Sequence, residues 1–403
     1  MTSSAPARDT RATRATYVAF AADGFAFASW ASRIPQVKVR LGLDASQLGL
    51  VLLAIAAGSV LALPVSGAVV GRFGSRRTVA AAALLAGAAL MIVAGGYQAG
   101  VAPVVAGLFA LGIATGTWDV AMNVQGAAVE RRLGRAIMAR FHAGFSLGTV
   151  AGALIGAAMV ALHVSVTAHM LLIGVMLVAG VPAAVQGFIA DAAVEGDADP
   201  GAGANTASAA PPGSALRAWR EPRTLLVGMF VLAFAFAEGS GNDWIGVAMV
   251  EGHRAAPVVG TLAFATFLGA MTAVRWCGPW LLDCYGRVPV VRTLSVIAVA
   301  GLILFAFGPS TPLAFAGALL WGSGVSLGFP VGMSAAADEP ALAAPRLGVI
   351  TSIGYCAFLG GPPLLGFLGQ RYTVRHALTA VVVLLVVSGA LAGVVRPRRR
   401  PDG

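Results

Sequence analysis

Carboxyl and amide side chains recur at helical spacing within apolar stretches of this sequence. Asp119 and Asn123 are four residues apart, and so are Glu238 and Asn242, with Asp243 directly after them. Residues at this spacing share one helix face. A carboxyl inside an apolar helix must face water or a partner, or carry a proton, and burial favours the protonated form. The pattern predicts proton-coupling carboxyls at Asp119 and Glu238, with the two amides and Asp243 available to bind a solute.

Each acid also has a structural interpretation. Asp119 could be hydrogen-bonded between helices without any role in transport chemistry, and Asn242 and Asp243 could lie at the outer water interface. Arg275, in the following apolar stretch, could neutralise Glu238 or Asp243 and leave a structural or gating ion pair in place of a proton site. The sequence alone leaves these alternatives open.

Three further side chains are candidates for solute contact. His142 has Ser146 at i+4 and could relay a proton or bind a hydroxyl, because imidazole titrates near neutrality. Trp118 and Trp321 could stack on a cyclic solute, and the alternative is a place in the aromatic belt at the membrane interface. The three cysteines and five histidines show no metal-ligand or redox spacing. We therefore expect no metal and no other cofactor.

The elements that position these residues are predicted to be membrane-spanning helices. The chain of 403 residues is 58% hydrophobic and 11% charged, with a mean hydropathy of +0.83, far from the balance of a globular domain. About twelve apolar stretches could cross roughly 30 Å of hydrocarbon as helices. They cover residues 17–33, 47–70, 78–97, 103–126, 137–162, 166–189, 223–247, 258–282, 293–308, 311–334, 347–368 and 376–395. Unbroken apolar runs favour helices over barrel strands, whose residues alternate.

A polar segment, residues 190–222, divides these stretches into six and six. It is rich in Gly, Ala, Pro and Asp and is predicted to be a cytoplasmic linker. The predicted parts are a tail (1–16), a bundle (17–189), this linker, a second bundle (223–395) and a basic tail (396–403). Features recur at an offset of about 210, such as "ALGIATG" at 110–116 and "ALLWGSG" at 318–324. Their common order indicates a duplicated six-helix unit.

Basic residues near the ends of the stretches predict the orientation. With the N-terminus inside, 20 of the 27 Lys and Arg residues fall in cytoplasmic segments and six in outer segments, while Arg275 lies within a span. This excess places both termini in the cytoplasm. It also accounts for the net charge of +10 without a nucleic-acid partner. The first apolar run contains Asp23 and does not read as a cleavable signal peptide.

The loop after the second stretch carries a motif of glycines and basic residues, "GAVVGRFGSRR". It resembles the signature of the major facilitator superfamily of transporters, in which an acid precedes the first basic residue. Gly67, Arg72, Gly74, Arg76 and Arg77 match, and Gly71 stands where the acid is expected. The second-half copy keeps Asp283, Gly286 and Arg287, with Cys284 at a usual basic position. The resemblance implies an all-α membrane protein of two pseudo-symmetric six-helix bundles, whose loops latch cytoplasmic helix ends during alternating access.

Other segments resemble a bacterial inner-membrane subgroup that is similar to the fucose:proton symporters. They are "ASWASRIP" at 28–35, "DVAMNVQGAAVE" at 119–130, "HAGFSLGTVAG" at 142–152, "FAEGSGNDW" at 236–244 and "LGFP" at 327–330. In that subgroup the fourth helix carries an acid, an alanine and an asparagine, which Asp119, Ala121 and Asn123 match. The subgroup also has an acid just before a Pro-Gln pair in the first helix, and the stretch "WASRIPQ" lacks it.

The resemblance and the residues together predict a secondary transporter and not an enzyme. We expect alternating-access uptake of a small polar solute, such as a sugar or related metabolite, coupled to the proton gradient across the inner membrane by a monomer. A proton-coupled exporter of drugs or metabolites is the first alternative, although the arginine usual in the fourth span of such exporters is absent. The second alternative is a membrane receptor or enzyme without transport. The absence of a recognisable catalytic motif argues against an enzyme, and the absence of a large soluble module argues against a receptor.

Overall fold

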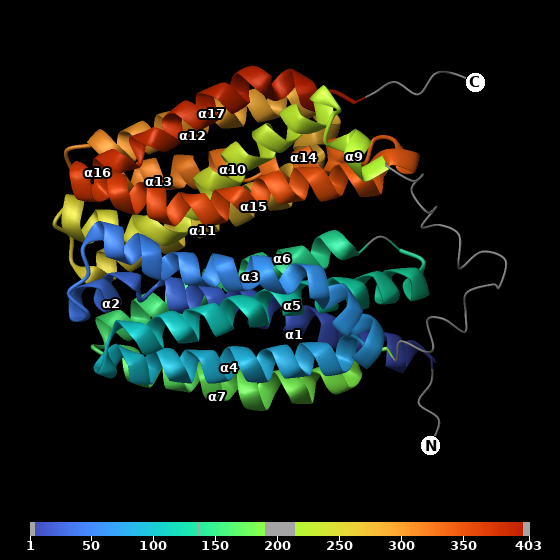
Figure 1. Cartoon of the computed structure of the whole chain (residues 1–403), viewed down its shortest axis with the longest axis horizontal. Coiled ribbons are helices and arrows are strands. Elements are labelled where there is room, and N and C mark those ends of the chain that lie inside the picture. Colours follow the sequence, from blue (N-terminus) through green and yellow to red (C-terminus); the bar gives the residue numbers. More distant parts are fainter. Residues whose placement is uncertain (1–4, 136, 190–213, 398–403) are drawn as a thin grey trace. The chain divides into compact units, whose positions relative to one another are not determined.

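The described parts of the chain are helical throughout. A computed structural model describes residues 5–135, 137–189 and 214–397, and these ranges contain helices and turns but no strand. The chain divides into a first unit, Met1–Gly203, and a second unit, Ala204–Gly403. Within each unit the long helices run side by side (Figure 1). Most of the predicted linker and the end of the basic tail, residues 190–213 and 398–403, lie outside the described residues.

The described residues of the first unit form six long helices and one short one. These are α1 (Ala5–Ala31), α2 (Ile34–Arg40), α3 (Ala45–Phe73), α4 (Ser75–Ala99), α5 (Val101–Leu133), α6 (Met138–Ala161) and α7 (Val166–Ala184), followed by a 3-10 turn, η1 (Val185–Gly187). Helix α1 begins at Ala5, well before the first apolar stretch. Asp44 caps α3: its side chain accepts a hydrogen bond from the backbone N–H of Gln47, and the Gln47 side-chain oxygen accepts one from the backbone N–H of Asp44.

The second unit repeats this plan with more interruptions. Its elements are α9 (Ser214–Ala218), α10 (Pro222–Val247), the π-helical turn η2 (Ala248–Gly252), α11 (Pro257–Tyr285), α12 (Arg287–Phe307), α13 (Thr311–Val325), α14 (Gly328–Ala336), α15 (Pro340–Arg371), α16 (Val374–Ala377), α17 (Thr379–Leu391) and η3 (Ala392–Val395). The predicted stretch 311–334 is thus broken between α13 and α14. Pro330 explains the break, because a proline ring clashes with the carbonyl four residues earlier, here that of Ser326.

Helix pairing is the same in the two units. In the first unit α1 packs on α6, α3 on α5, and α4 on both α5 and α7. In the second unit the helices of the same order pair in the same way: α10 on α15, α11 on α13, and α12 on both α13 and α17. This agreement supports the duplicated six-helix unit that the recurring segments predict.

Eleven of the described helical segments are long and apolar enough to cross a membrane. Helix α1 is not among them, although its 27 residues would extend about 40 Å. Charged residues in its first half and Asp23 in its second half lower its hydropathy. It nevertheless packs against α5, α6 and α7, as a member of the bundle. The prediction of an all-α membrane protein is confirmed in these ranges.

Candidate functional site

A polar cluster on α1 and α5 contains Asp119, Asn123 and Asp23. Asn123 donates its side-chain amide to the Asp119 carboxylate at 3.0 Å and to the Asp119 backbone carbonyl at 2.8 Å. Both side chains are half-buried. Asp23 of α1 is 5% exposed and lies close enough to Asp119 for the two carboxyls to interact electrostatically. One Asp23 oxygen is buried without a hydrogen-bond partner in the structure.

The structure brings two carboxyls and one amide together where the sequence indicated one carboxyl and one amide. Asp23 stands in the first predicted span, but its position early in that span gave no reason to pair it with Asp119. The signal that could have found it is the repeat, since Asp23-Gly24 occupies the place of Glu238-Gly239 in the second half. A carboxyl in apolar surroundings that lacks a cation is the kind of group that binds a proton.

His142 and Trp118 have different environments in the first unit. His142 on α6 is exposed, and its ring lies edge-on to Phe20 of α1 at 5.1 Å between centroids. The Trp118 ring is completely buried, and its indole nitrogen has no hydrogen-bond partner in the structure. In this conformation His142 is accessible to a solute and Trp118 is not. Burial favours packing for Trp118, whose solute contact stays a prediction.

The second acidic position is occupied by an ion pair. The Arg275 guanidinium on α11 lies 2.7 Å from the Glu238 carboxylate on α10, and its Nε donates to the Ser326 carbonyl at 3.0 Å. That carbonyl stands at the break between α13 and α14, where Pro330 prevents a continuous helix. Arg275 therefore neutralises an acid and satisfies a backbone group that the break leaves free. Of the alternatives open at the sequence level, this contact favours an ion pair for Glu238.

The neighbours of Glu238 on α10 are not drawn into this ion pair. Asn242 and Asp243 are half-buried, and the Asn242 side-chain oxygen is buried without a hydrogen-bond partner in the structure. Trp321 on α13 is fully buried between Phe267 and Phe305, with ring centroids 5.3 and 5.9 Å away. Asn242 thus has an unused acceptor for a ligand, whereas Trp321 packs inside the unit. Solute binding by all three residues stays a prediction.

The two predicted latch loops share a backbone conformation. Gly74 joins α3 to α4 with φ +80°, and Gly286 joins α11 to α12 with φ +77°, a region that favours glycine. Gly67 lies on α3 in open surroundings. Arg72, Arg76 and Arg77 are exposed and form no ion pair in the part of the chain that the structure describes. The loops thus match in shape but differ in charge partners.

The second loop has an acidic partner that the motif does not contain. Arg287 pairs with Asp338, after α14, at 2.7 Å, and Arg223 at the start of α10 pairs with the same carboxylate at 3.0 Å. Asp283 is exposed and has no ion pair within the described ranges. The motif therefore located the cation and not its anion. Asp338 follows the broken span in a segment without any motif, so sequence reasoning had no signal for it.

Comparison with known proteins identifies the family to which the chain is similar. Residues 16–344 match the Major Facilitator Superfamily. The chain is 31% identical over 386 residues to an uncharacterized MFS-type transporter of Yersinia pestis, covering 94% of each protein. It is 27% identical over 382 residues to the membrane protein MosC of Rhizobium meliloti, covering 94% of this chain and 89% of MosC.

Solved structures support the same fold at low sequence identity. A bacterial homolog of the human lysosomal transporter Spinster aligns with a TM-score of 0.78 and 13% identity, over 99% of this chain and 100% of the other. The nucleoside transporter NupG aligns with a TM-score of 0.72 and 16% identity, over 96% and 98%. These likenesses concern the fold alone, whereas the sequence match extends to the family. This chain belongs to the major facilitator superfamily of membrane transporters.

Proposed function

We propose that this transporter is a proton-coupled symporter that takes up a small polar solute, such as a sugar or related metabolite, across the inner membrane by alternating access. The observation that carries the proposal is the cluster of Asp23, Asp119 and Asn123. Two carboxyls interact there without any ion-pair partner in the described ranges. Two like charges in apolar surroundings repel each other, so binding one proton relieves the cost of holding both.

Asp119 is the proton-carrying group in this proposal and Asn123 its sensor. A carboxylate only accepts hydrogen bonds, but a protonated carboxyl also carries an O–H donor. Protonation of Asp119 therefore weakens the hydrogen bond that its carboxylate accepts from the Asn123 amide. The amide hydrogen that Asn123 donates to the carboxylate would then be available to a solute hydroxyl or carbonyl, while the bond to the Asp119 backbone carbonyl remains. Protonation and solute binding would thereby favour each other, which is the coupling that symport requires. The likeness of Asp119, Ala121 and Asn123 to the fucose:proton symporters supports this assignment.

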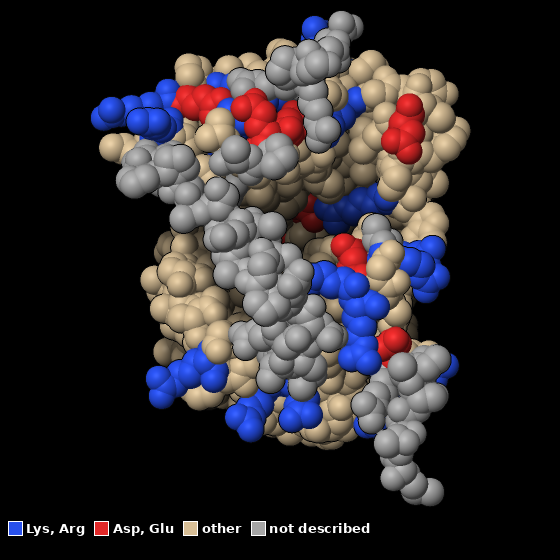
Figure 2. Space-filling model, turned by 90° about the vertical axis from the view of Figure 1, so that its right-hand side faces the viewer, with Lys and Arg blue, Asp and Glu red and all other residues tan. Residues whose placement is uncertain are grey.

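Glu238 has a separate role in this proposal. Because Arg275 compensates its charge, the pair is neutral without a proton, and we assign it to holding the break between α13 and α14. Asn242, with an unused oxygen, would be the solute-binding group of the second unit. Lys and Arg side chains, with Asp and Glu among them, lie at helix ends in Figure 2, and the excess of Lys and Arg in the segments assigned to the inside supports a cytoplasmic placement for those ends.

The test is proton movement in proteoliposomes that contain the purified protein. The vesicles are challenged with sugars, sugar acids, nucleosides and cationic drugs while the outside pH is recorded. We expect one solute class to alkalinise the medium, with the signal lost in Asp119→Asn and retained in Asp44→Asn, which keeps the helix cap at α3. Acidification of the medium would instead assign an exporter. Solute flux without proton flux in both variants would overturn the coupling role of Asp119.

A further inference from the structure

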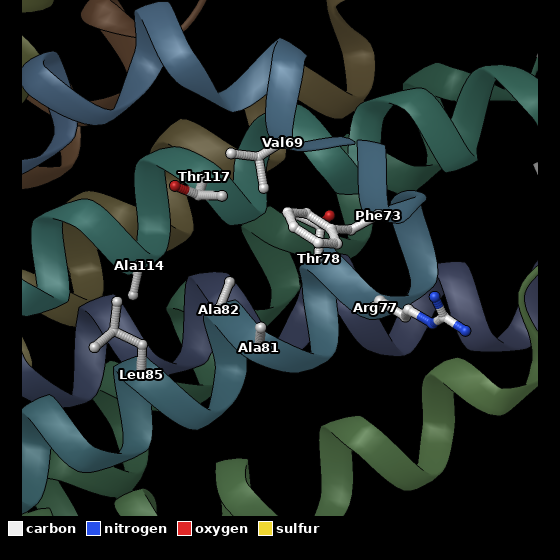
Figure 3. A pocket seen from close by; sticks show the side chains of 9 residues that line it. All are labelled: Val69, Phe73, Arg77, Thr78, Ala81, Ala82, Leu85, Ala114 and Thr117. Atoms are coloured by element: carbon white, nitrogen blue, oxygen red, sulfur yellow. The ribbon is translucent and has the colours of Figure 1, made fainter. Parts of the chain in front are cut away.

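A groove on the surface of the first unit is not used by the proposed transport cluster. Helices α3 and α4 each pack closely along α5 but contact one another only weakly, so they diverge and leave α5 as a floor. The resulting groove has a volume of about 390 Å³, within the range of roughly 300–1,000 Å³ typical of ligand sites. We call it the α3–α5 groove. Figure 3 shows its lining side chains.

The lining of the α3–α5 groove is mostly apolar, with Arg77 at one end and the side chains of Thr78 and Thr117 along it. Val69, Phe73, Ala81 and Leu85 form much of it, and Phe73 and Leu85 are 51% and 38% exposed. These residues lie on segments that would cross the membrane, so the medium around them is lipid. An apolar groove of this kind fits an acyl chain better than it fits a polar solute.

Arg77 lies at the polar end of the groove, beyond Phe73 (Figure 3). It stands in the first turn of α4, where the chain leaves the membrane. Arg72 and Arg76 lie beside it in the sequence, and all three arginines are exposed and form no ion pair in the described ranges. Gly71 occupies the position where the family signature has an acid. The loop is therefore a cluster of cations without an internal counter-charge.

We propose that the α3–α5 groove binds an anionic phospholipid, with one acyl chain along Phe73, Ala81 and Leu85 and the phosphate paired with Arg77. Charge complementarity identifies the occupant. The exposed arginines attract an anion. An anion that lies at the membrane surface and has a tail in the hydrocarbon is an acidic lipid. The absent acid at position 71 removes the competitor for these arginines. This inference concerns a site apart from Asp23 and Asp119 and does not depend on the transported solute.

Lipid retention by the purified full-length protein tests the proposal. Native mass spectrometry measures binding of phosphatidylglycerol and, separately, phosphatidylcholine to wild type, Arg77→Gln and Ala81→Phe. Arg135→Gln removes an exposed arginine from another loop, and Val175→Phe enlarges an exposed position on α7, so both serve as matched controls. We expect wild type to retain phosphatidylglycerol preferentially. Arg77→Gln should weaken its binding roughly fivefold, the effect of one arginine near an anionic surface, and Ala81→Phe should abolish the tight site.

Cross-linking in membranes locates the lipid independently of those variants. A photoreactive benzoylphenylalanine in place of Phe73 should capture phosphatidylglycerol, and the same group in place of Val175 should capture phosphatidylglycerol and phosphatidylcholine alike. Equal retention of the two lipids by wild type would overturn the proposal. So would equal losses in Arg77→Gln and Arg135→Gln, or equal capture of both lipids at position 73.

Discussion

At the scale of single residues, the two acids predicted for proton coupling differ in the charge of their partners. Asp119 accepts a hydrogen bond from a neutral amide, Asn123, which cannot compensate a negative charge. Glu238 is paired with a cation, Arg275, which can. A carboxylate with a cationic partner needs no proton to be neutral as a pair, whereas one beside an amide and a second acid does. The difference separates a transport role from a positioning role.

The Glu238–Arg275 pair gives the first prediction. Arg275→Met leaves both the Glu238 carboxylate and the Ser326 carbonyl without their donor, so we expect a loss of about 1–3 kcal/mol in the free energy of unfolding. Glu238→Gln should cost less, because an amide oxygen still accepts from Arg275. Thermal unfolding in detergent measures both. The double variant should be more stable than Arg275→Met alone, and strict additivity of the two changes would contradict a direct pairing.

His253, which directly follows the π-helical turn η2, gives a pH prediction. Burial lowers its pKa, and repulsion from Arg375 adds to this, although a 2.9 Å hydrogen bond to the Phe305 carbonyl opposes it. The folded state thus resists a proton that the unfolded chain takes up below about pH 6.5. Above that pH the group contributes no pH dependence, and stability falls as pH decreases below it.

The corresponding measurement is thermal unfolding between pH 5 and 8 for wild type and His253→Gln. Glutamine keeps a donor for Phe305 but does not titrate. Stability of the wild type should fall more steeply than that of the variant as the pH decreases. Parallel curves would show that His253 takes up its proton equally well in the folded and unfolded chain.

At the scale of helices, glycine positions decide how closely neighbours approach. Gly144, Gly148 and Gly152 face α1 from α6, against Tyr17, the Ala21 backbone and the Phe25 carbonyl respectively. This contact makes the glycine repeat a ridge on which α1 packs closely. It matters for the site because α1 carries Asp23, and the crossing of α1 holds that residue in place within the unit.

We therefore expect Gly148→Ala to destabilise the protein. Its new methyl group would collide with the backbone of Ala21, which cannot move aside as a side chain can, at a cost of about 1–3 kcal/mol. Gly180→Ala is the matched control, since Gly180 lies on α7 with nothing within 4 Å of the added carbon. Alanine should be neutral or favourable there. Equal melting temperatures for the two variants would contradict close packing of α1 on α6.

A buried arginine between α1 and α2 contacts α7 and the turn before it. Arg33 is 2% exposed, and it donates to the His169 ring at 2.9 Å and to the Val164 carbonyl at 3.1 Å. Arg33→Ala should cost about 1–3 kcal/mol, because two buried acceptors lose their donor. Arg40→Ala, at an exposed contact with Gln98, should change stability by no more than about 0.5 kcal/mol. Chemical unfolding of both variants compares the two losses, and similar values would contradict a structural role for Arg33.

At the scale of the whole molecule, the parts that the sequence predicted are those set by local composition. Apolar length identified eleven of the spans, and recurring segments indicated the repeat that the helix pairing bears out. The unpredicted parts depend on contacts between distant residues. The break before Pro330 needs Arg275 to satisfy Ser326, and Asp338 meets Arg287 only in the folded unit. Asp23 can be identified in the sequence as an acid in the first predicted span, but its proximity to Asp119 on α5 depends on how α1 packs.

The orientation of the chain in the membrane is the remaining whole-molecule prediction. Because 20 of the 27 Lys and Arg residues lie in segments assigned to the inside and six outside, the termini should face the cytoplasm. Cys277, Cys284 and Cys356, all exposed, are first replaced by serine. A membrane-impermeant maleimide should then label Arg40→Cys in intact cells and Arg135→Cys only after permeabilisation. The reverse pattern would invert the topology, and would place the arginines beside the α3–α5 groove at the outer surface, where the same lipid test applies.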